Sequence, residues 1–169
     1  MLESVLLLIF PMAMAFAAAN DLFTMKIPNK ISLALIAAFA VSALYIQLPV
    51  QTALTYVGIG ALVLVVGFVM FSLRLLGGGD AKLMAAGAMF MGPDHALMYV
   101  AYVTIFGGLL SAAILFYRKF VPVSATALPG WAVKLHAQGT GIPYGLAIAA
   151  SGLVMYPQTI WYQALAAVQ

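Results

Sequence analysis

Apolar stretches of about twenty residues recur along this chain, and few charges separate them. Of its 169 residues, 66% are hydrophobic and 7% are charged, whereas a soluble domain carries about 25% charged residues. So few charges cannot cover a water-facing surface, while an apolar stretch of about 20 residues forms a helix that crosses a bilayer. We therefore expect an all-α, polytopic membrane protein whose surface largely contacts the lipid bilayer.

Six segments are apolar enough to serve as membrane spans. They cover residues 2–19, 31–48, 52–73, 81–91 and 96–117, and a last segment that begins near Ile142 and bends at Pro157. The fourth is too short to cross at about 1.5 Å per residue unless it extends back through the glycines before it. Together the spans predict one transmembrane domain over residues 1–169.

The charged residues divide between the two ends of these spans. Three alternate connections contain all seven basic residues, which are Lys26, Lys30, Arg74, Lys82, Arg118, Lys119 and Lys134. Glu3 and Asp94 fall on the opposite side. Loops rich in Lys and Arg remain in the cytoplasm. We therefore expect a multi-pass protein of the cytoplasmic (inner) membrane, with both termini outside and the three basic connections in the cytoplasm.

The two remaining acids, Asp21 and Asp80, both fall at the cytoplasmic ends of their spans. They can meet if the first and fourth spans pack together. Two apposed carboxylates cannot both ionise cheaply, so such a pair shares one proton. The ionised member can take a proton from water while the neutral member polarises a peptide carbonyl, as in aspartic proteases.

Three consecutive glycines, Gly77, Gly78 and Gly79, come directly before Asp80. Without Cβ atoms they allow positive φ and let another backbone approach closely, which suits an enzyme that holds its substrate extended. Simpler interpretations exist: each aspartate caps a helix, and the glycines form a flexible turn or a close helix contact. Capping alone gives no reason for three glycines in a row.

Two polar residues lie near the aspartates in the sequence. Lys82 either stabilises anionic Asp80, contacts substrate, or anchors its helix at the membrane interface. Asn29 either caps the second span or hydrogen-bonds near Asp21, and capping is the more common role. The chain has no cysteine and no ligand cluster with metal spacing, so we expect neither a metal nor a cofactor. Nothing resembles the basic stripe of a nucleic-acid-binding protein.

These motifs resemble those of the type IV prepilin peptidases, membrane aspartic proteases of the GxGD class. "GGGDAKL" (77–83) resembles the G-x-G-D-x-K-L run of that family, "DLFTMKIPN" (21–29) resembles its aspartate followed by Ile-Pro-Asn, and "IPYG" (142–145) resembles a third motif. The resemblance implies that Asp21 and Asp80 are the catalytic pair. It also implies cleavage at the cytoplasmic membrane face, on a pilin-like substrate with a basic leader and an apolar helix.

Two departures narrow the resemblance. Larger prepilin peptidases carry a cytoplasmic insert with paired CxxC zinc motifs and also methylate the new N-terminus, whereas this chain has no cysteine and no insert after its first span. It looks most like the small, peptidase-only branch that serves Flp (tight-adherence) pili. Archaeal preflagellin peptidases are similar in size and layout. From the residues alone, a small ion-coupled transporter and a non-catalytic membrane subunit of a pilus apparatus also stay open.

Overall fold

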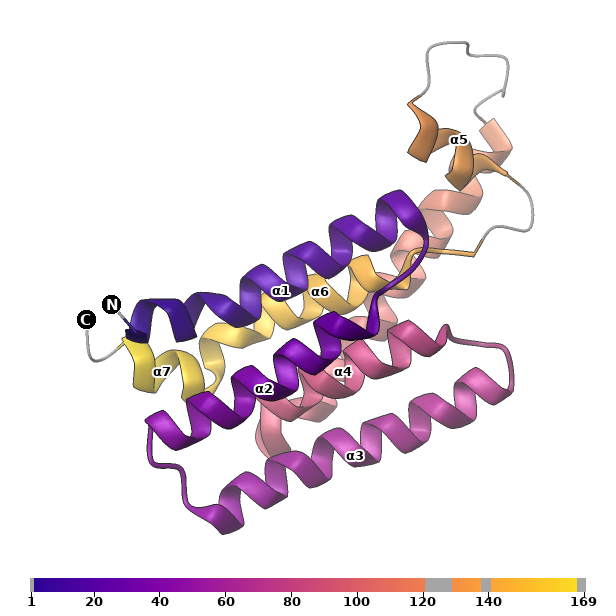
Figure 1. Cartoon of the computed structure of the whole chain (residues 1–169). Coiled ribbons are helices and arrows are strands. Elements are labelled where there is room, and N and C mark those ends of the chain that lie inside the picture. The colour runs from indigo at the N-terminus through magenta and orange to yellow at the C-terminus, as the bar shows by residue number, and fades with distance from the viewer. Residues whose placement is uncertain (1, 121–128, 138–140, 167–169) are drawn as a thin grey trace.

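The computed structural model describes residues 2–120, 129–137 and 141–166, which form a bundle of helices (Figure 1). The helices are α1 (Leu2–Thr24), α2 (Asn29–Tyr45), α3 (Val50–Ser72), α4 (Gly78–Phe120), α5 (Gly130–His136), α6 (Tyr144–Met155), a 3₁₀ turn η1 (Tyr156–Gln158) and α7 (Ile160–Ala166). No strand occurs in the described residues, so the all-α expectation is confirmed. α1, α3 and α4 are long and apolar enough to cross a membrane, and α2 is apolar but shorter.

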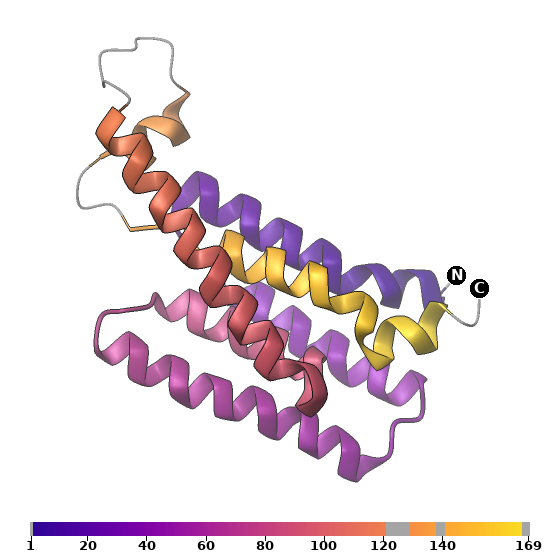
Figure 2. The same cartoon turned by 180° about the vertical axis from the view of Figure 1, so that it is seen from behind.

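α4 consists of two helices joined by a sharp reversal at Gly92. Gly92 has a φ of 65° and a ψ of −172°, a combination that is essentially restricted to glycine. Pro93 cannot donate the backbone hydrogen bond that would continue the helix. The chain turns back at this point (Figures 1 and 2). The spans expected at 81–91 and 96–117 are therefore the two halves of α4, and the first half does extend back into the glycines.

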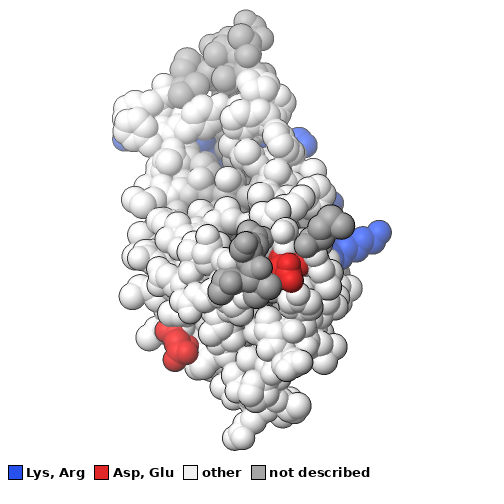
Figure 3. Space-filling model, turned by 90° about the vertical axis from the view of Figure 1, so that its left-hand side faces the viewer, with Lys and Arg blue, Asp and Glu red and all other residues white. Residues whose placement is uncertain are grey.

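The two ends of the bundle carry different charges. Both termini and the α2–α3 turn lie at one end, and the α1–α2 connection, the α3–α4 connection and α5 lie at the other (Figure 1). Glu3 and Asp94 lie at the first end. Figure 3 looks onto this end and shows acidic side chains on it, with basic side chains mainly at the edges of the view. Every basic residue belongs to the connections or helix ends of the other end. We call this second end the basic end.

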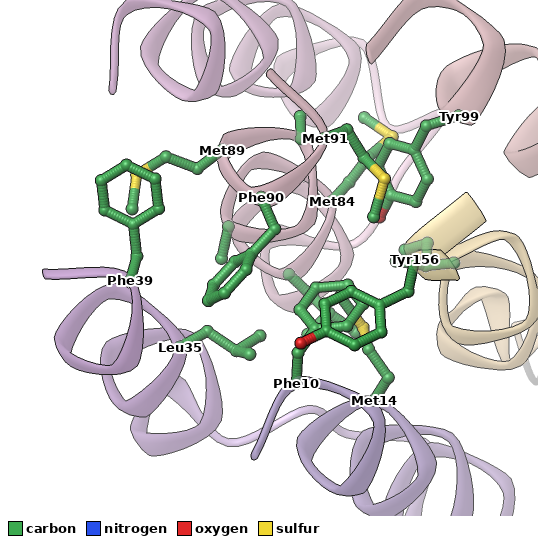
Figure 4. Packing of buried hydrophobic residues seen from close by; sticks show 14 of the residues in the cluster. Phe10, Met14, Leu35, Phe39, Met84, Met89, Phe90, Met91, Tyr99 and Tyr156 are labelled. Carbon is green, nitrogen blue, oxygen red and sulfur yellow. The ribbon is translucent and has the colours of Figure 1, made fainter. Parts of the chain in front are cut away.

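Aromatic and methionine side chains fill the centre of the bundle (Figure 4). Phe10 of α1 stacks on Tyr156 with ring centroids 4.7 Å apart and lies 4.8 Å from Phe90 of α4. The indole Nε1 of fully buried Trp161 donates a 2.7 Å hydrogen bond to the Phe90 carbonyl. That carbonyl lies where the first half of α4 ends, so the indole satisfies an acceptor that the helix leaves free. The C-terminal helices thereby fix the reversal at Gly92.

The reversal gives a stability prediction. Gly92→Ala is expected to lower the free energy of unfolding by about 2 kcal/mol or more, because a Cβ strains this backbone and would overlap the Tyr56 ring. Thermal unfolding in detergent measures the effect. Gly58→Ala in α3 is the matched control, since no atom lies within 4 Å of its added Cβ. Equal melting temperatures for the two variants would contradict the prediction.

Candidate active site

Asp21 lies in the last turn of α1 and is only 5% exposed. Its Oδ2 accepts a 2.8 Å hydrogen bond from the backbone N–H of Gly145, in the first turn of α6. The N–H groups of a first helical turn have no partner within their own helix, and the helix dipole favours negative charge beside them. A carboxylate is costly to bury without a hydrogen bond. The start of α6 therefore makes this buried position possible for Asp21.

Gly145 is the residue type that this contact requires. A Cβ built on it would lie 2.8 Å from the Asp21 Oδ2, 2.9 Å from the Asp21 Cβ and 2.9 Å from the Ile27 Cδ1. Carbon atoms do not approach that closely, so any larger residue would push α6 away from the carboxylate. The glycine of "IPYG" thus has a physical role that the residues alone did not indicate.

The turn after α1 brings Ile27 into the same place. Met25 ends the helix with a φ of 57°, a conformation that turns the chain at helix C-termini. The side-chain amide of Asn20 donates a 2.7 Å hydrogen bond to the Lys26 carbonyl and so holds the turn. Pro28 then occupies the cap position of α2. Ile27 is left between the start of α6 and the start of α4.

Asp80 lies in the first turn of α4 and is half-buried. Its carboxylate lies beside Gly77, the residue before α4, and the Gly77 carbonyl accepts a hydrogen bond from the N–H of Ala81 at 3.0 Å. An acidic side chain that reaches back to the cap residue is half of a capping box. Asp80 thus does stabilise the start of a helix, although from inside the first turn and not from the cap position itself.

The three glycines have three different surroundings. None adopts a positive φ, because Gly92 is the only described glycine that does; this part of the sequence interpretation is wrong. A Cβ on Gly79 would lie 3.1 Å from both the Cβ and the carbonyl oxygen of Ile27, and one on Gly77 would lie 2.5 Å from the Asp80 Oδ2. A Cβ on Gly78 would meet only the Phe71 ring, at an ordinary 3.4 Å. Gly79 therefore lets the backbone of Ile27 approach closely, whereas Gly77 leaves room for the carboxylate of Asp80.

The structure brings the two aspartates together at the basic end. Ile27 lies against Gly79, which directly precedes Asp80, and against Gly145, whose backbone N–H donates the hydrogen bond to Asp21. The two carboxylates are close enough to interact electrostatically. α1 and α4 touch through rings of the core, while α6 packs along both of them and joins them. Among the described residues no Lys or Arg forms an ion pair with either carboxylate.

The structure also places Asn29 and Lys82 next to each other. The Lys82 Nζ donates a 3.0 Å hydrogen bond to the Asn29 Oδ1. Asn29 is the first residue of α2, and no side chain caps that helix, so the expectation that Asn29 is a cap is wrong. No group of three or more His, Cys, Asp or Glu that could hold a metal is found in the part of the chain that the structure describes.

α5 lies over the basic end and is tied to the helices that carry the site. The Arg118 Nε at the end of α4 donates a 2.7 Å hydrogen bond to the Leu135 carbonyl. The Lys134 Nζ donates a 3.4 Å hydrogen bond to the Phe23 carbonyl, two residues after Asp21. The residues on either side of α5, 121–128 and 138–140, lie outside the described part of the chain.

One buried and one half-buried carboxylate thus interact at one end of this all-α membrane protein. Ionisable groups within membrane proteins are generally retained for function, so the pair belongs to the class of intramembrane acid sites. Residues 8–112 match the sequence profile of the type IV leader peptidase family. The chain belongs to this family, and it is a membrane protease that acts on pilin-like substrates. No curated protein and no solved structure matches the chain.

The glycine contacts give a prediction for leader peptidase activity. Gly79→Ala and Gly145→Ala are each expected to lower cleavage about 100-fold, the typical effect of moving a reacting group by about 1 Å. Gly78→Ala should retain most of the activity because its Cβ has room. Cleavage of a leader-bearing substrate in isolated membranes, corrected for enzyme abundance, measures the three variants. Equal losses in all three would show that the glycines act through chain flexibility and not through close approach.

Proposed function

We propose that the chain is an aspartic endopeptidase in which Asp21 and Asp80 form the catalytic pair. The observation that carries the proposal is the buried Asp21, which has one backbone hydrogen bond, no cation partner among the described residues, and a second carboxylate within electrostatic range. Such surroundings are costly for a carboxylate, so its presence there indicates a functional group. Residues 1–169 would form one peptidase domain.

The proposed reaction needs one proton shared between the two carboxylates. The ionised carboxylate takes a proton from water, and the water oxygen bonds to the carbonyl carbon of the scissile peptide. At the same time the protonated carboxylic acid donates a hydrogen bond to the carbonyl oxygen. The tetrahedral intermediate then breaks its C–N bond, and the amine leaves with a proton from the acid. No covalent enzyme intermediate and no cofactor takes part. Because Asp21 Oδ2 already accepts a hydrogen bond from Gly145, its other oxygen is the one that we expect to contact the reacting water.

We propose five further residues as binding or positioning residues: Gly77, Gly78, Gly79, Lys82 and Asn29. Among them Gly78 has room for a methyl group, so its contribution should survive substitution by alanine. The close approaches at Gly77 and Gly79 support a role in setting the carboxylates in place. The hydrogen bond between Lys82 and Asn29 supports a shared role beside the acids. We expect Asn29→Ala to retain measurable cleavage because Asn29 positions and does not react.

The proposed substrate is a Flp-type prepilin with a basic leader and an apolar helix. Its leader would remain in the cytoplasm while its helix lies in the bilayer, so the scissile bond would fall at the membrane boundary. The position of both aspartates at the basic end of the bundle supports such a cleavage site. An archaeal preflagellin has the same layout and stays an alternative substrate. An ion-coupled transporter fits less well, since acids at one end of the bundle do not form a relay through the membrane midplane.

The aspartates give the principal test. Asp21→Asn and Asp80→Asn are each expected to lower cleavage of a co-expressed Flp-type prepilin by about 10²- to 10⁴-fold, the contribution of a general acid or base. Asp94→Asn is the matched control, because Asp94 lies at the opposite end of the bundle. A gel shift of the pilin reports cleavage, and immunoblotting reports enzyme abundance. Cleavage that survives in either active-site variant at normal abundance would return that aspartate to the role of a helix cap.

We also propose that the basic end faces the cytoplasm of the inner membrane and that both termini face outside, because basic loops remain inside. The chain has no cysteine, so a single introduced thiol reports its side. Gln51→Cys should react with a membrane-impermeant maleimide in intact spheroplasts, and Gly130→Cys only after the membrane is opened. The reverse pattern would refute the orientation and place the aspartates on the wrong side for a cytoplasmic leader.

A further inference from the structure

α2 and α3 are consecutive helices that barely touch each other, and each packs instead on α4. A cavity of about 970 Å³ lies between them, and its floor is formed by the first half of α4, at Lys82, Ala85, Ala86 and Met89. We call this cavity the α2–α3 groove. It begins at Asn29 beside the basic end and reaches Val50 at the opposite end of the bundle.

The groove is almost wholly apolar and open to its surroundings. Leu33, Leu44, Leu54 and Leu64 line it, and between 42% and 80% of each side chain is exposed. In a membrane protein these leucines lie in hydrocarbon, so the groove can exchange its contents with the bilayer sideways. An occupant must therefore be apolar and embedded in the membrane.

One group in the groove has no partner. The Ser32 hydroxyl lines it one turn from Asn29, and the residue is only 5% exposed. Its Oγ makes no hydrogen bond within the described part of the chain. Buried polar groups are nearly always hydrogen-bonded, and leaving one unpaired is unfavourable. The groove thus contains a hydrogen-bonding site that the protein itself does not fill.

We propose that the α2–α3 groove seats the apolar transmembrane helix of the substrate, with Ser32 hydrogen-bonded to the first turn of that helix; this rests on the proposed peptidase function. A helix that starts near the basic end has N–H groups in its first turn without partners of their own. Ser32 lies at that end, and its buried Oγ would accept from one of them once the side chain turns toward the groove. A lipid acyl chain offers no donor, so the unpaired hydroxyl favours a peptide occupant.

A second cavity serves as the internal comparison. It has about 450 Å³ and lies between α3 and the second half of α4, with Thr104 in its wall. The Thr104 hydroxyl already donates a 2.7 Å hydrogen bond to the Ala101 carbonyl. This cavity is smaller, and its hydroxyl is already hydrogen-bonded, so the α2–α3 groove is the better seat.

The first test narrows the groove. Ala40 of α2 is exposed and lines it, whereas Ala37 of the same helix is exposed and does not. Ala40→Phe is expected to lower kcat/KM for the prepilin roughly tenfold or more, the effect of an overpacked contact, and Ala37→Phe to leave it unchanged. If the wild type does not cleave the prepilin, the proposed function fails. If the wild type cleaves the prepilin and both variants cleave it equally well, only the assignment of the groove is refuted.

Ser32→Ala tests the hydrogen bond. It should lower kcat/KM about two- to tenfold, mainly through KM, as expected for one lost hydrogen bond. The melting temperature in detergent should stay the same or rise, since the substitution removes an unpaired buried hydroxyl. A purely structural role would instead lower the melting temperature along with activity. Unchanged kinetics would overturn the role of Ser32.

Cross-linking locates the substrate helix without relying on activity. In an Asp80→Asn background and with an added thiol oxidant, Ala40→Cys should form a disulfide with a prepilin that carries one cysteine in its apolar helix. Thr104→Cys in the second cavity is the matched control and should form none. An adduct at Thr104→Cys, or the lack of one at Ala40→Cys, would overturn the assignment of the groove.

Discussion

The hydrogen bond from the Gly145 N–H to the Asp21 carboxylate joins the first long helix to the last part of the chain, and the site depends on it. A carboxylate that is 5% exposed needs a donor. A side-chain donor such as Lys would pair with it as an ion and hold it ionised. A backbone N–H at a helix start supplies the hydrogen bond and a fractional positive charge instead. The carboxylate is thereby held in place through one oxygen, and the proposed mechanism uses the other.

This contact sets the spacing of everything around it. Because Gly145 has no side chain, α6 approaches close enough for Ile27 to pack on it, and Ile27 then fills the space beside Gly79. The start of α4 is drawn in by the same residue, which brings Asp80 within electrostatic range of Asp21. Two glycines and one isoleucine thus fix the separation of two acids that come from different helices. An added methyl group at either glycine acts on both acids at once.

The sequence predicts the parts of this arrangement that follow from local patterns. Apolar length predicts the spans, including the break between residues 91 and 96 where the chain reverses, and the distribution of Lys and Arg predicts that both aspartates share one end. Contacts between distant segments are not predicted by such patterns. The partner of Asp21 is 124 positions away, and nothing in "IPYG" states which group its glycine approaches. Asn29 likewise reads as a cap, whereas in three dimensions it bonds Lys82 of another helix.

Asn29 and Lys82 line the α2–α3 groove where it reaches the basic end, which also carries both aspartates. In the proposed enzyme, this arrangement would address a geometric problem of leader cleavage. A helical substrate hides its carbonyls in its own hydrogen bonds, so the scissile peptide must be extended while the following residues remain helical. The N–H groups at the start of that helix then lose their partners. An enzyme that offers acceptors where the helix begins, and glycines where the chain must be extended, lowers the free energy of unwinding at one position only. Cleavage would then be directed by where the substrate's helix starts as well as by its sequence.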